Sequence, residues 1–243
     1  MQTQVDHLVV AARTLQEGVA WCEATLGITP GAGGEHPLFG THNRLFRIAT
    51  VNYPRAYFEI IAINSEAPHA MNTPANGQKS SQNKRWFDLD SPALQDAIQS
   101  SPRLVHFVAN TSDVSKACAA LQTLGIDRGP AVQASRMTPA GLLQWQITVR
   151  EDGQRLFHGG LPTLIQWGTP DEAPAVAVHP ANGMQDSGVS LLNLHMTTPH
   201  AAELQAAHQA IGLQGISVEA GTPDFIAKLQ TPKGLVTLES KGI

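Results

Sequence analysis

The chain has 243 residues, 42% of them hydrophobic, and its 16 basic and 20 acidic side chains give a formal net charge of −4, as in a globular protein with a real core. No run of Lys or Arg is longer than two residues, so the charge pattern of a nucleic-acid binder is excluded. No apolar stretch approaches the roughly 18 residues that span a bilayer, and no signal-type segment precedes the first strand, so we expect a cytoplasmic protein without membrane partners.

The first predicted unit begins with a strand in VDHLVVAA and continues with an amphipathic helix. Thr14 followed by Glu17 is a capping box for that helix, and Gly27 is the residue type expected just after its end. RLFRIA and YFEIIAI then have the composition of β-strands. The glycine-rich stretch PGAGGEHPLFGTHN replaces the strand that would otherwise follow the helix.

The same order of elements recurs twice along the chain. QTLGIDRGP repeats ATLGITP, QAIGLQG does so more loosely, and each closes a helix that follows an apolar strand, LVHFVAN or SLLNLHMTT. Each unit therefore has the order β-α-β-β-β. The predicted boundaries are 1–64 for the first module, 65–102 for a connector with a short helix at SPALQDAIQS, 103–169 for a second module, 170–186 for a linker and 187–243 for a third module.

Strand alternation selects the candidate functional groups of the first module. Val5 and His7 are expected to point to one face of their strand and Asp6 to the other. In YFEIIAI, Glu59 lies among apolar neighbours. A carboxylate in so apolar a strand is costly to bury unless it is paired or bound to a cation, which makes Glu59 a candidate for function.

Paired β-α-β-β-β modules, with a histidine on the first strand and a glutamate on the last, resemble the vicinal oxygen chelate superfamily, which includes glyoxalase I, extradiol dioxygenases and fosfomycin-resistance proteins. DHLVVAARTLQEGVAWCEATLGI, YFEIIAI, RWFDLD and LPTLIQWG are similar to its glyoxalase-like domain family (glyoxalase, bleomycin resistance and dioxygenase type), and HPLFGTHNRL is the most specific part. The resemblance implies an α+β fold in which two modules pair into a curved, cup-shaped mixed sheet with a site in the concavity. It does not imply one reaction.

In the resembling metalloenzymes the metal ligands come from the first and last strands of both modules. Aligning the helices places His106 opposite His7 and Gln166 at the position of Glu59, so the expected ligand set is His7, Glu59, His106 and Gln166. Such nitrogen and oxygen donors suit a divalent metal, Zn²⁺, Fe²⁺, Mn²⁺ or Ni²⁺. A strand histidine is more often a hydrogen-bonded core residue, so a cup without metal stays open, in which Glu59 is a general base or binds a substrate hydroxyl.

A second set of candidates surrounds the loop GGEHPLFGTHNRL near the rim of the first sheet. The expected substrate contacts are His36, Thr41, His42, Asn43, Arg47 and Trp145. The alternative for Thr41 and Asn43 is a turn in which they satisfy local backbone groups. Arg47 either meets an anionic group or lies on the solvated face, and the alternative for Trp145 is packing in the core.

Three functions follow from the resemblance. The first is a metal-dependent lyase or isomerase of glyoxalase type, with His7 and Glu59 as catalytic residues acting on a small molecule with vicinal oxygens. The second is a metal-free protein that binds or sequesters a small molecule, and the third is an extradiol-type dioxygenase with His7, His106 and Glu59 as ligands. The third module lacks the histidine and glutamate pair, and its concave face must be buried against a partner subunit in a homodimer, the linker or the outside of the first two modules.

Overall fold

The protein is described by a computed structural model that covers residues 2–66, 84–138, 141–168 and 179–243. The first module comprises β1 (Thr3–Ala11), α1 (Leu15–Leu26), β2 (Gly31–His36), β3 (Thr41–Arg47) and β4 (Tyr57–Ile63). The connector contains the short turn η3 (Trp86–Asp88) and the helix α2 (Pro92–Ala97), and the second module contains β5 (Arg103–Thr111), α3 (Val114–Gln122), β6 (Ala131–Thr138), β7 (Gly141–Thr148), η4 (Phe157–Gly159) and β8 (Thr163–Trp167). The rest of the chain forms η5 (Pro180–Gly183), β9 (Ser190–Thr198), α4 (Ala201–Ala210), β10 (Ile216–Ala220), β11 (Asp224–Thr231) and β12 (Gly234–Glu239).

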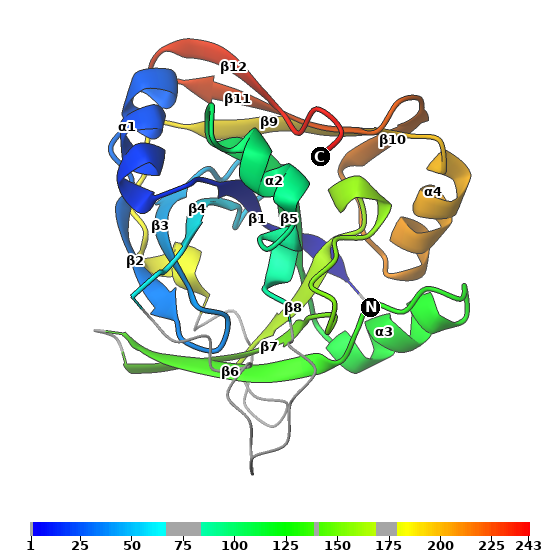
Figure 1. The fold of residues 1–243 in the computed structure, drawn as a ribbon. Helices are drawn as coiled ribbons and strands as arrows, with labels where there is room; N and C mark the ends of the chain where they lie inside the picture. The colour runs from blue at the N-terminus through cyan, green and yellow to red at the C-terminus, as the bar shows by residue number, and fades with distance from the viewer. Residues whose placement is uncertain (1, 67–83, 139–140, 169–178) are drawn as a thin grey trace.

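The first two modules form one mixed sheet of eight strands in the order β2-β3-β4-β1-β5-β8-β7-β6. Within each module the first strand is parallel to the last, β1 to β4 and β5 to β8. The antiparallel pair of β1 and β5 joins the modules and crosses the middle of the molecule in Figure 1. This arrangement confirms the predicted α+β fold in which two modules share one cup-shaped sheet.

The expectation that glycines replace a strand in the first module is wrong, because Gly31–His36 forms β2. This edge strand pairs antiparallel with β3 and has a register shift between Ala32 and Glu35. Three of its first four residues are glycines, so the strand has no alternating pattern of apolar and polar side chains from which it could be predicted. A Cβ atom on Gly33 would lie 2.1 Å from the carbonyl oxygen of Asn43, so glycine allows the two strands to approach at that point.

Two hydrophobic cores lie on opposite faces of the eight-stranded sheet. The convex face packs Leu8 and Phe58 against the helices α1, α3 and α4 and against the second sheet. The concave face carries Val9 and Trp145, and the segment from η3 to α2 covers part of it with Trp86 and other apolar side chains. The connector therefore supplies one wall of the concavity.

The third module has the predicted order of elements but a different strand order, β10-β9-β11-β12. Its first strand is parallel to the strand after the helix, β10, and antiparallel to β11. It forms its own sheet, drawn yellow to red across the top of Figure 1. Phe225 of β11 lies 5.4 Å from Phe107 of β5, ring centre to ring centre, in the convex core. Of the three expected placements, the structure has the one against the outside of the first two modules, and the homodimer stays a prediction.

None of the helices in the described ranges is long and apolar enough to cross a membrane. Residues 67–83 of the predicted connector, residue 169 at the end of the predicted second module and residues 170–178 of the predicted linker lie outside the described residues.

Candidate functional site

A β-bulge near the start of β1 decides which side chains enter the concavity. Val5 pairs with Ala109 of β5 and His7 pairs with the preceding Val108, so Asp6 is an extra residue on β1. Val5 packs in the convex core, whereas the side chains of Asp6 and His7 contact each other and residues of the concave side. The predicted alternation, with Val5 and His7 on one face and Asp6 on the other, is wrong because a bulge shifts the side-chain period by one residue.

His7 lies between two carboxylates. Its Nδ1 is 2.7 Å from Oδ1 of Asp6 and its Nε2 is 3.4 Å from Oε2 of Glu59 on the adjacent strand β4. Burial lowers the pKa of His7, but the hydrogen bonds and charges of both carboxylates outweigh it and raise that pKa to about 9. Burial raises the pKa of Glu59, and its contacts with His7 and Asn43 reverse this and lower it. The pair is therefore an imidazolium and a carboxylate near neutral pH.

Asp6 is fully buried and is surrounded by donors. Besides His7, it accepts hydrogen bonds at Oδ2 from Trp167 Nε1 at 2.8 Å, His179 Nε2 at 2.8 Å and Asn110 Nδ2 at 3.3 Å. Burial raises the pKa of Asp6, but His179 and His7 outweigh it and hold that pKa well below its usual range. The backbone N–H of Ala181 donates to Nδ1 of His179, which fixes the proton of that ring on Nε2. Asp6 is thus a permanent negative charge behind His7.

Asn43 on β3 orients Glu59 from the other side. Its Nδ2 donates to Oε1 of Glu59 at 2.5 Å, and its Oδ1 accepts from the backbone N–H of Gly34 at 2.7 Å, which sets the direction of the amide. The same Nδ2 lies 3.4 Å from Nε2 of His36, whose Nδ1 lies 3.1 Å from Oγ1 of Thr41. Burial lowers the pKa of His36 to about 4, so its ring is neutral. Three predicted substrate contacts thus belong to the hydrogen-bond network that holds Glu59.

The cavity at this pair is small, about 30 Å³, which is room for about two water molecules. The ring of Tyr57 stacks on His7 with 4.5 Å between ring centres. Apolar and aromatic side chains form most of the wall together with Arg136 of the β6–β7 hairpin: Leu45, Tyr57, Trp86, Phe87, Arg136, Trp145, Ile147, Ile165 and Trp167. Within the described part of the chain, Nε1 of Trp86 and Nε of Arg136 are buried and have no hydrogen-bond partner.

His106 and Gln166, the two ligands expected from the second module, are engaged elsewhere. Nδ1 of His106 donates to the carbonyl oxygen of Gly159 at 3.1 Å, and its Nε2 accepts from the backbone N–H of Thr163 at 3.0 Å. Oε1 of Gln166 accepts at 2.9 Å from the backbone N–H of Val114, the first residue of α3. The four predicted ligands therefore do not converge, because one serves the core of the second module and the other serves a helix on the convex side.

The gathered residues do not fit the expected divalent metal. Across the ranges that the structure describes, no three His, Cys, Asp or Glu side chains are arranged to hold one. Nδ1 of His7 is held by Asp6 and Nε2 lies 3.4 Å from Oε2 of Glu59, so this site offers at most the pair His7 and Glu59, fewer protein ligands than the three or four typical of such a metal. Of the set His7, His106 and Glu59 expected for a dioxygenase, the structure brings together His7 and Glu59, whereas His106 is engaged by Gly159 and Thr163.

The remaining predicted contacts divide between the cavity and the surface. Trp145 lines the cavity and lies 5.7 Å from Trp167, ring centre to ring centre. His42 is half-buried beside Ala62, on the face of β3 opposite to Asn43. Arg47 donates from Nη1 to the carbonyl oxygen of Ala181 at 2.9 Å, which ties the segment around η5 to the sheet.

Sequence reasoning missed Asp6, His179 and Arg136. Asp6 directly precedes His7, but nothing local to VDHLVV shows the bulge that turns its side chain into the concavity. His179 and Arg136 lie in stretches without a motif, and tertiary contacts alone bring them to the site.

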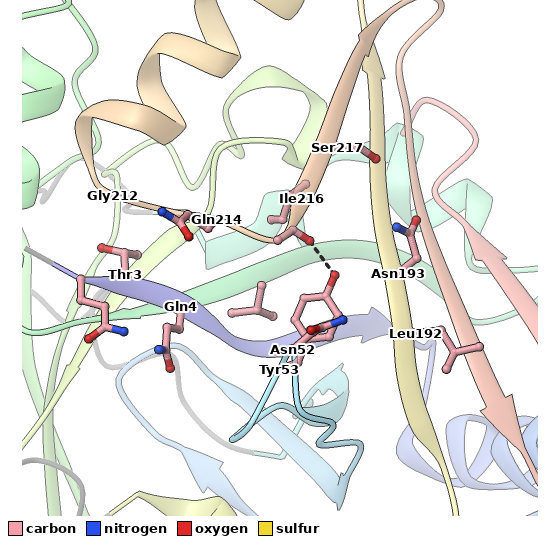
Figure 2. Close-up of a pocket in the computed structure, with 13 residues that line it drawn as sticks. Thr3, Gln4, Asn52, Tyr53, Leu192, Asn193, Gly212, Gln214, Ile216 and Ser217 are labelled. Atoms are coloured by element: carbon pink, nitrogen blue, oxygen red, sulfur yellow. Dashed lines mark hydrogen bonds between the residues drawn. The ribbon is translucent and has the colours of Figure 1, made fainter.

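A larger cavity of about 780 Å³ lies on another side of the molecule (Figure 2). Its walls come from the start of β1, the turn at Asn52 and Tyr53, and the strands β9 and β10. The hydroxyl of Tyr53 donates to the carbonyl oxygen of Gly215 at 2.5 Å, drawn as a dashed line in Figure 2. The lining offers amides and hydroxyls but no carboxylate, histidine, lysine or arginine side chain. Volume favours this cavity as a binding space, yet the acid–base groups lie at His7 and Glu59, which we take as the candidate site.

Residues 5–212 match the family described as a glyoxalase-like domain. No curated protein matches the chain. Among solved structures, a hypothetical protein from Staphylococcus aureus is 15% identical, with a TM-score of 0.58 over 98% of this chain and 85% of that one, which supports the fold. A variant of methylmalonyl-CoA epimerase from Streptomyces coelicolor, in complex with 2-nitronate-propionyl-CoA, is 16% identical, with a TM-score of 0.40 over 70% of this chain and 100% of that one. The methylmalonyl-CoA epimerase of Mycobacterium tuberculosis is 16% identical, with a TM-score of 0.37 over 72% of this chain and 91% of that one.

Proposed function

Since this chain belongs to the glyoxalase-like domain family of the vicinal oxygen chelate superfamily, we propose that it is an enzyme of isomerase or lyase type that moves a proton on a small substrate with vicinal oxygens. The observation that supports this most is the buried pair of His7 and Glu59, 3.4 Å apart in the cavity of the first two modules. A protonated imidazole and a carboxylate side by side are an acid and a base aimed at one point.

In the proposed reaction Glu59 removes a proton from a carbon next to a carbonyl group, and the electron pair of that C–H bond moves to the carbonyl oxygen. The imidazolium of His7 donates a hydrogen bond or its proton to this oxygen and stabilises the enol or enolate. Once the planar enol turns its other face or its neighbouring carbon to Glu59, return of the proton from Glu59 completes an isomerisation, and the oxygen of the re-formed carbonyl gives back to His7 any proton that His7 donated. No atom is gained or lost by the protein over the cycle.

Substrate binding itself makes Glu59 a stronger base. In the free protein His7 holds the pKa of Glu59 low. A substrate oxygen that takes over the hydrogen bond of His7 leaves Asn43 as the remaining partner of the carboxylate, and a buried carboxylate with fewer donors has a higher pKa. Asp6 keeps His7 protonated and oriented during this exchange of partners, so we assign it a positioning role.

The experiment is deuterium incorporation from D₂O into carbon acids, followed by NMR. Pyruvate, 2-oxobutyrate and the neutral hydroxyketone acetoin are the probes, because each has a C–H bond beside a carbonyl group. Wild-type protein should accelerate exchange in at least one of them, and Glu59→Gln and His7→Gln should each lower the rate by about a hundredfold or more. Glu219→Gln, an exposed carboxylate of β10, is the control and should leave the rate unchanged.

Two outcomes contradict the proposal. The first is wild-type protein that binds the probes and accelerates deuterium exchange in none of them. The second is an accelerated exchange that persists in Glu59→Gln.

The second candidate function is metal-free binding of a small molecule without chemistry. The low pKa of Glu59 favours it, since an imidazolium–carboxylate pair that is stable without substrate is a weak base. Binding without deuterium exchange is the result expected of such a protein.

A further inference from the structure

Two side chains of the cavity wall carry a buried donor that has no acceptor among the described residues. Trp86 is 5% exposed, and its Nε1 has no hydrogen-bond partner among the described residues. Arg136 is half-buried, but its Nε atom is buried and unpartnered too, and none of the ion pairs within that part of the chain includes its guanidinium. Both side chains line the cavity that holds His7 and Glu59. Buried donors are nearly always satisfied in proteins, so two in one small cavity call for acceptors that the described residues do not supply.

The carboxylates of the site are not free to serve Arg136. The oxygens of Glu59 are engaged by His7 and Asn43, and Asp6 accepts from four side chains. Gly34 makes room for the arginine, because a Cβ atom there would lie 2.5 Å from Nη1 of Arg136. The guanidinium therefore lies against Gly34 of the edge strand β2 and lines the same cavity as His7 and Glu59, and no carboxylate of the described residues forms an ion pair with it.

The chemistry of the missing partner follows from these donors. An indole N–H and a guanidinium have no acceptor atoms, so the ligand must bring acceptors, and a positively charged fork favours a planar anion with two oxygens. The apolar walls at Trp145, Ile147 and Ile165 suit a short aliphatic chain, which requires the cavity to open beyond its present volume of about 30 Å³ when the ligand binds. A phosphate would need more donors and would bring more negative charge next to Glu59 than a carboxylate does.

We propose that Arg136 and Trp86 bind the carboxylate of the substrate and that the substrate class is a short-chain carboxylic acid with a carbonyl group beside the carboxylate. The two vicinal oxygens then divide between the donors, with the carboxylate on Arg136 and Trp86 and the carbonyl oxygen on His7. The assignment of the reacting end depends on the function proposed above. The carboxylate site does not depend on it, since it follows from the unpartnered donors alone.

The test is a titration followed by tryptophan fluorescence, because Trp86, Trp145 and Trp167 line the cavity. The probes are pyruvate, 2-oxobutyrate, the neutral analogue pyruvamide and inorganic phosphate. We expect wild-type protein to bind 2-oxobutyrate at least about tenfold more tightly than pyruvamide or phosphate. Arg136→Met should weaken 2-oxobutyrate binding by about tenfold to a hundredfold, and Trp86→Phe, which keeps an aromatic ring without the N–H, by about threefold to tenfold.

Arg44→Met is the matched control. Arg44 lies on β3 opposite Ile60, which packs in the convex core, so its side chain is on the other face of the sheet and binding should not change. Arg136→Gln, with circular dichroism to confirm folding, separates loss of the charge from a change in packing, and should weaken binding as Arg136→Met does.

Three results would overturn the inference: pyruvamide binding as tightly as pyruvate, phosphate binding more tightly than 2-oxobutyrate, or Arg136→Met binding like wild type. Failure of the proposed function is distinguishable from these. If carboxylates bind in an Arg136-dependent way and no probe exchanges deuterium, the enzymatic proposal fails and the carboxylate site stands. Glu59→Gln is expected to lose exchange while it still binds 2-oxobutyrate.

Discussion

The carboxylate of Asp6 accepts a hydrogen bond from Nδ1 of His7 at 2.7 Å, although the two are consecutive residues of one strand. In a regular strand they would point to opposite faces of the sheet. The bulge between Val5 and His7 brings both into the concavity, so the negative charge of Asp6 stands directly behind the imidazole that meets Glu59. Asp6, the preceding residue, thus helps to keep His7 protonated, and it can do so because of the β-bulge in β1.

Replacement of Asp6 by asparagine should be strongly destabilising. The substitution keeps the shape but leaves the His7 imidazolium with Glu59 alone and turns an acceptor of several hydrogen bonds into a partial donor. Breaking a buried charge pair costs about 3–5 kcal/mol, and we expect a loss of this order in the free energy of unfolding measured with urea. The pKa of His7, followed by NMR, should fall at the same time. Asp96→Asn, at an exposed position of α2, should change stability by less than about 0.5 kcal/mol.

Stability should decrease as the pH rises through the slightly alkaline range. The pKa of His7 is raised from 6.5 to about 9 in the folded protein, so its contribution is fully present below pH 6.5 and is lost as the pH approaches 9. The pKa of His36 is lowered to about 4, so its contribution is lost in the opposite direction, as the pH falls from 6.5 towards 4. Between pH 6.5 and 8.5, His7 should therefore make the free energy of unfolding fall by up to about 1.4 kcal/mol per pH unit.

Urea unfolding at several pH values between about 6.5 and 8.5 measures this slope of the free energy of unfolding against pH. His7→Gln should flatten it, whatever the absolute stability of the variant. His42→Gln, at a half-buried histidine outside the cavity, should retain it. A wild-type slope that survives in His7→Gln would assign the titration to another group.

The adjacent glycines of β2 should respond differently to alanine. A Cβ atom at Gly33 would lie 2.1 Å from the backbone oxygen of Asn43, which cannot move without breaking the strand pair, so Gly33→Ala should lose about 1–3 kcal/mol of stability. At Gly34 the nearest atom is Nη1 of Arg136, the end of a flexible side chain. Gly34→Ala should therefore keep stability within about 1 kcal/mol and displace the guanidinium, which weakens 2-oxobutyrate binding. Thermal unfolding and the fluorescence titration measure the two effects. Equal losses of stability in both variants would show that the guanidinium is held rigidly.

Gln166 should matter for α3 and not for the chemistry. Its Oε1 accepts a hydrogen bond from the backbone N–H of Val114 at the start of that helix. Gln166→Ala should lower the free energy of unfolding by about 0.5–1.5 kcal/mol and leave the rate of deuterium exchange unchanged. Gln146→Ala, at its register partner on β7, is the matched control and should have a smaller effect on stability. Loss of exchange in Gln166→Ala would restore Gln166 to the candidate site.

Much of the local structure could be predicted because it depends on residues close in sequence. The side chain of Thr14 accepts from the backbone N–H of Glu17 at 3.2 Å, and Gly27 ends α1 with a φ of 78°, as the capping box and the glycine predict. The repeat predicts the order of elements in each module, and the resemblance to the glyoxalase-like family predicts the pairing of the first two. It does not predict the strand order of the third, because a β-α-β-β-β order is compatible with more than one pairing of the strands.

The sequence by itself determined the paired modules, the apolar strands and the presence of a histidine and a glutamate within them, since periodicity and capping are local properties of the chain. The tertiary structure decided which polar groups meet. The register between β1 and β5 created the bulge at Asp6, and the folding of the second module turned His106 and Gln166 to other partners. It also brought Arg136 over Gly34 and His179 against Asp6, contacts that join residues 102 and 173 positions apart. Such contacts depend on how strands pair and sheets close, and no local pattern of residues encodes them.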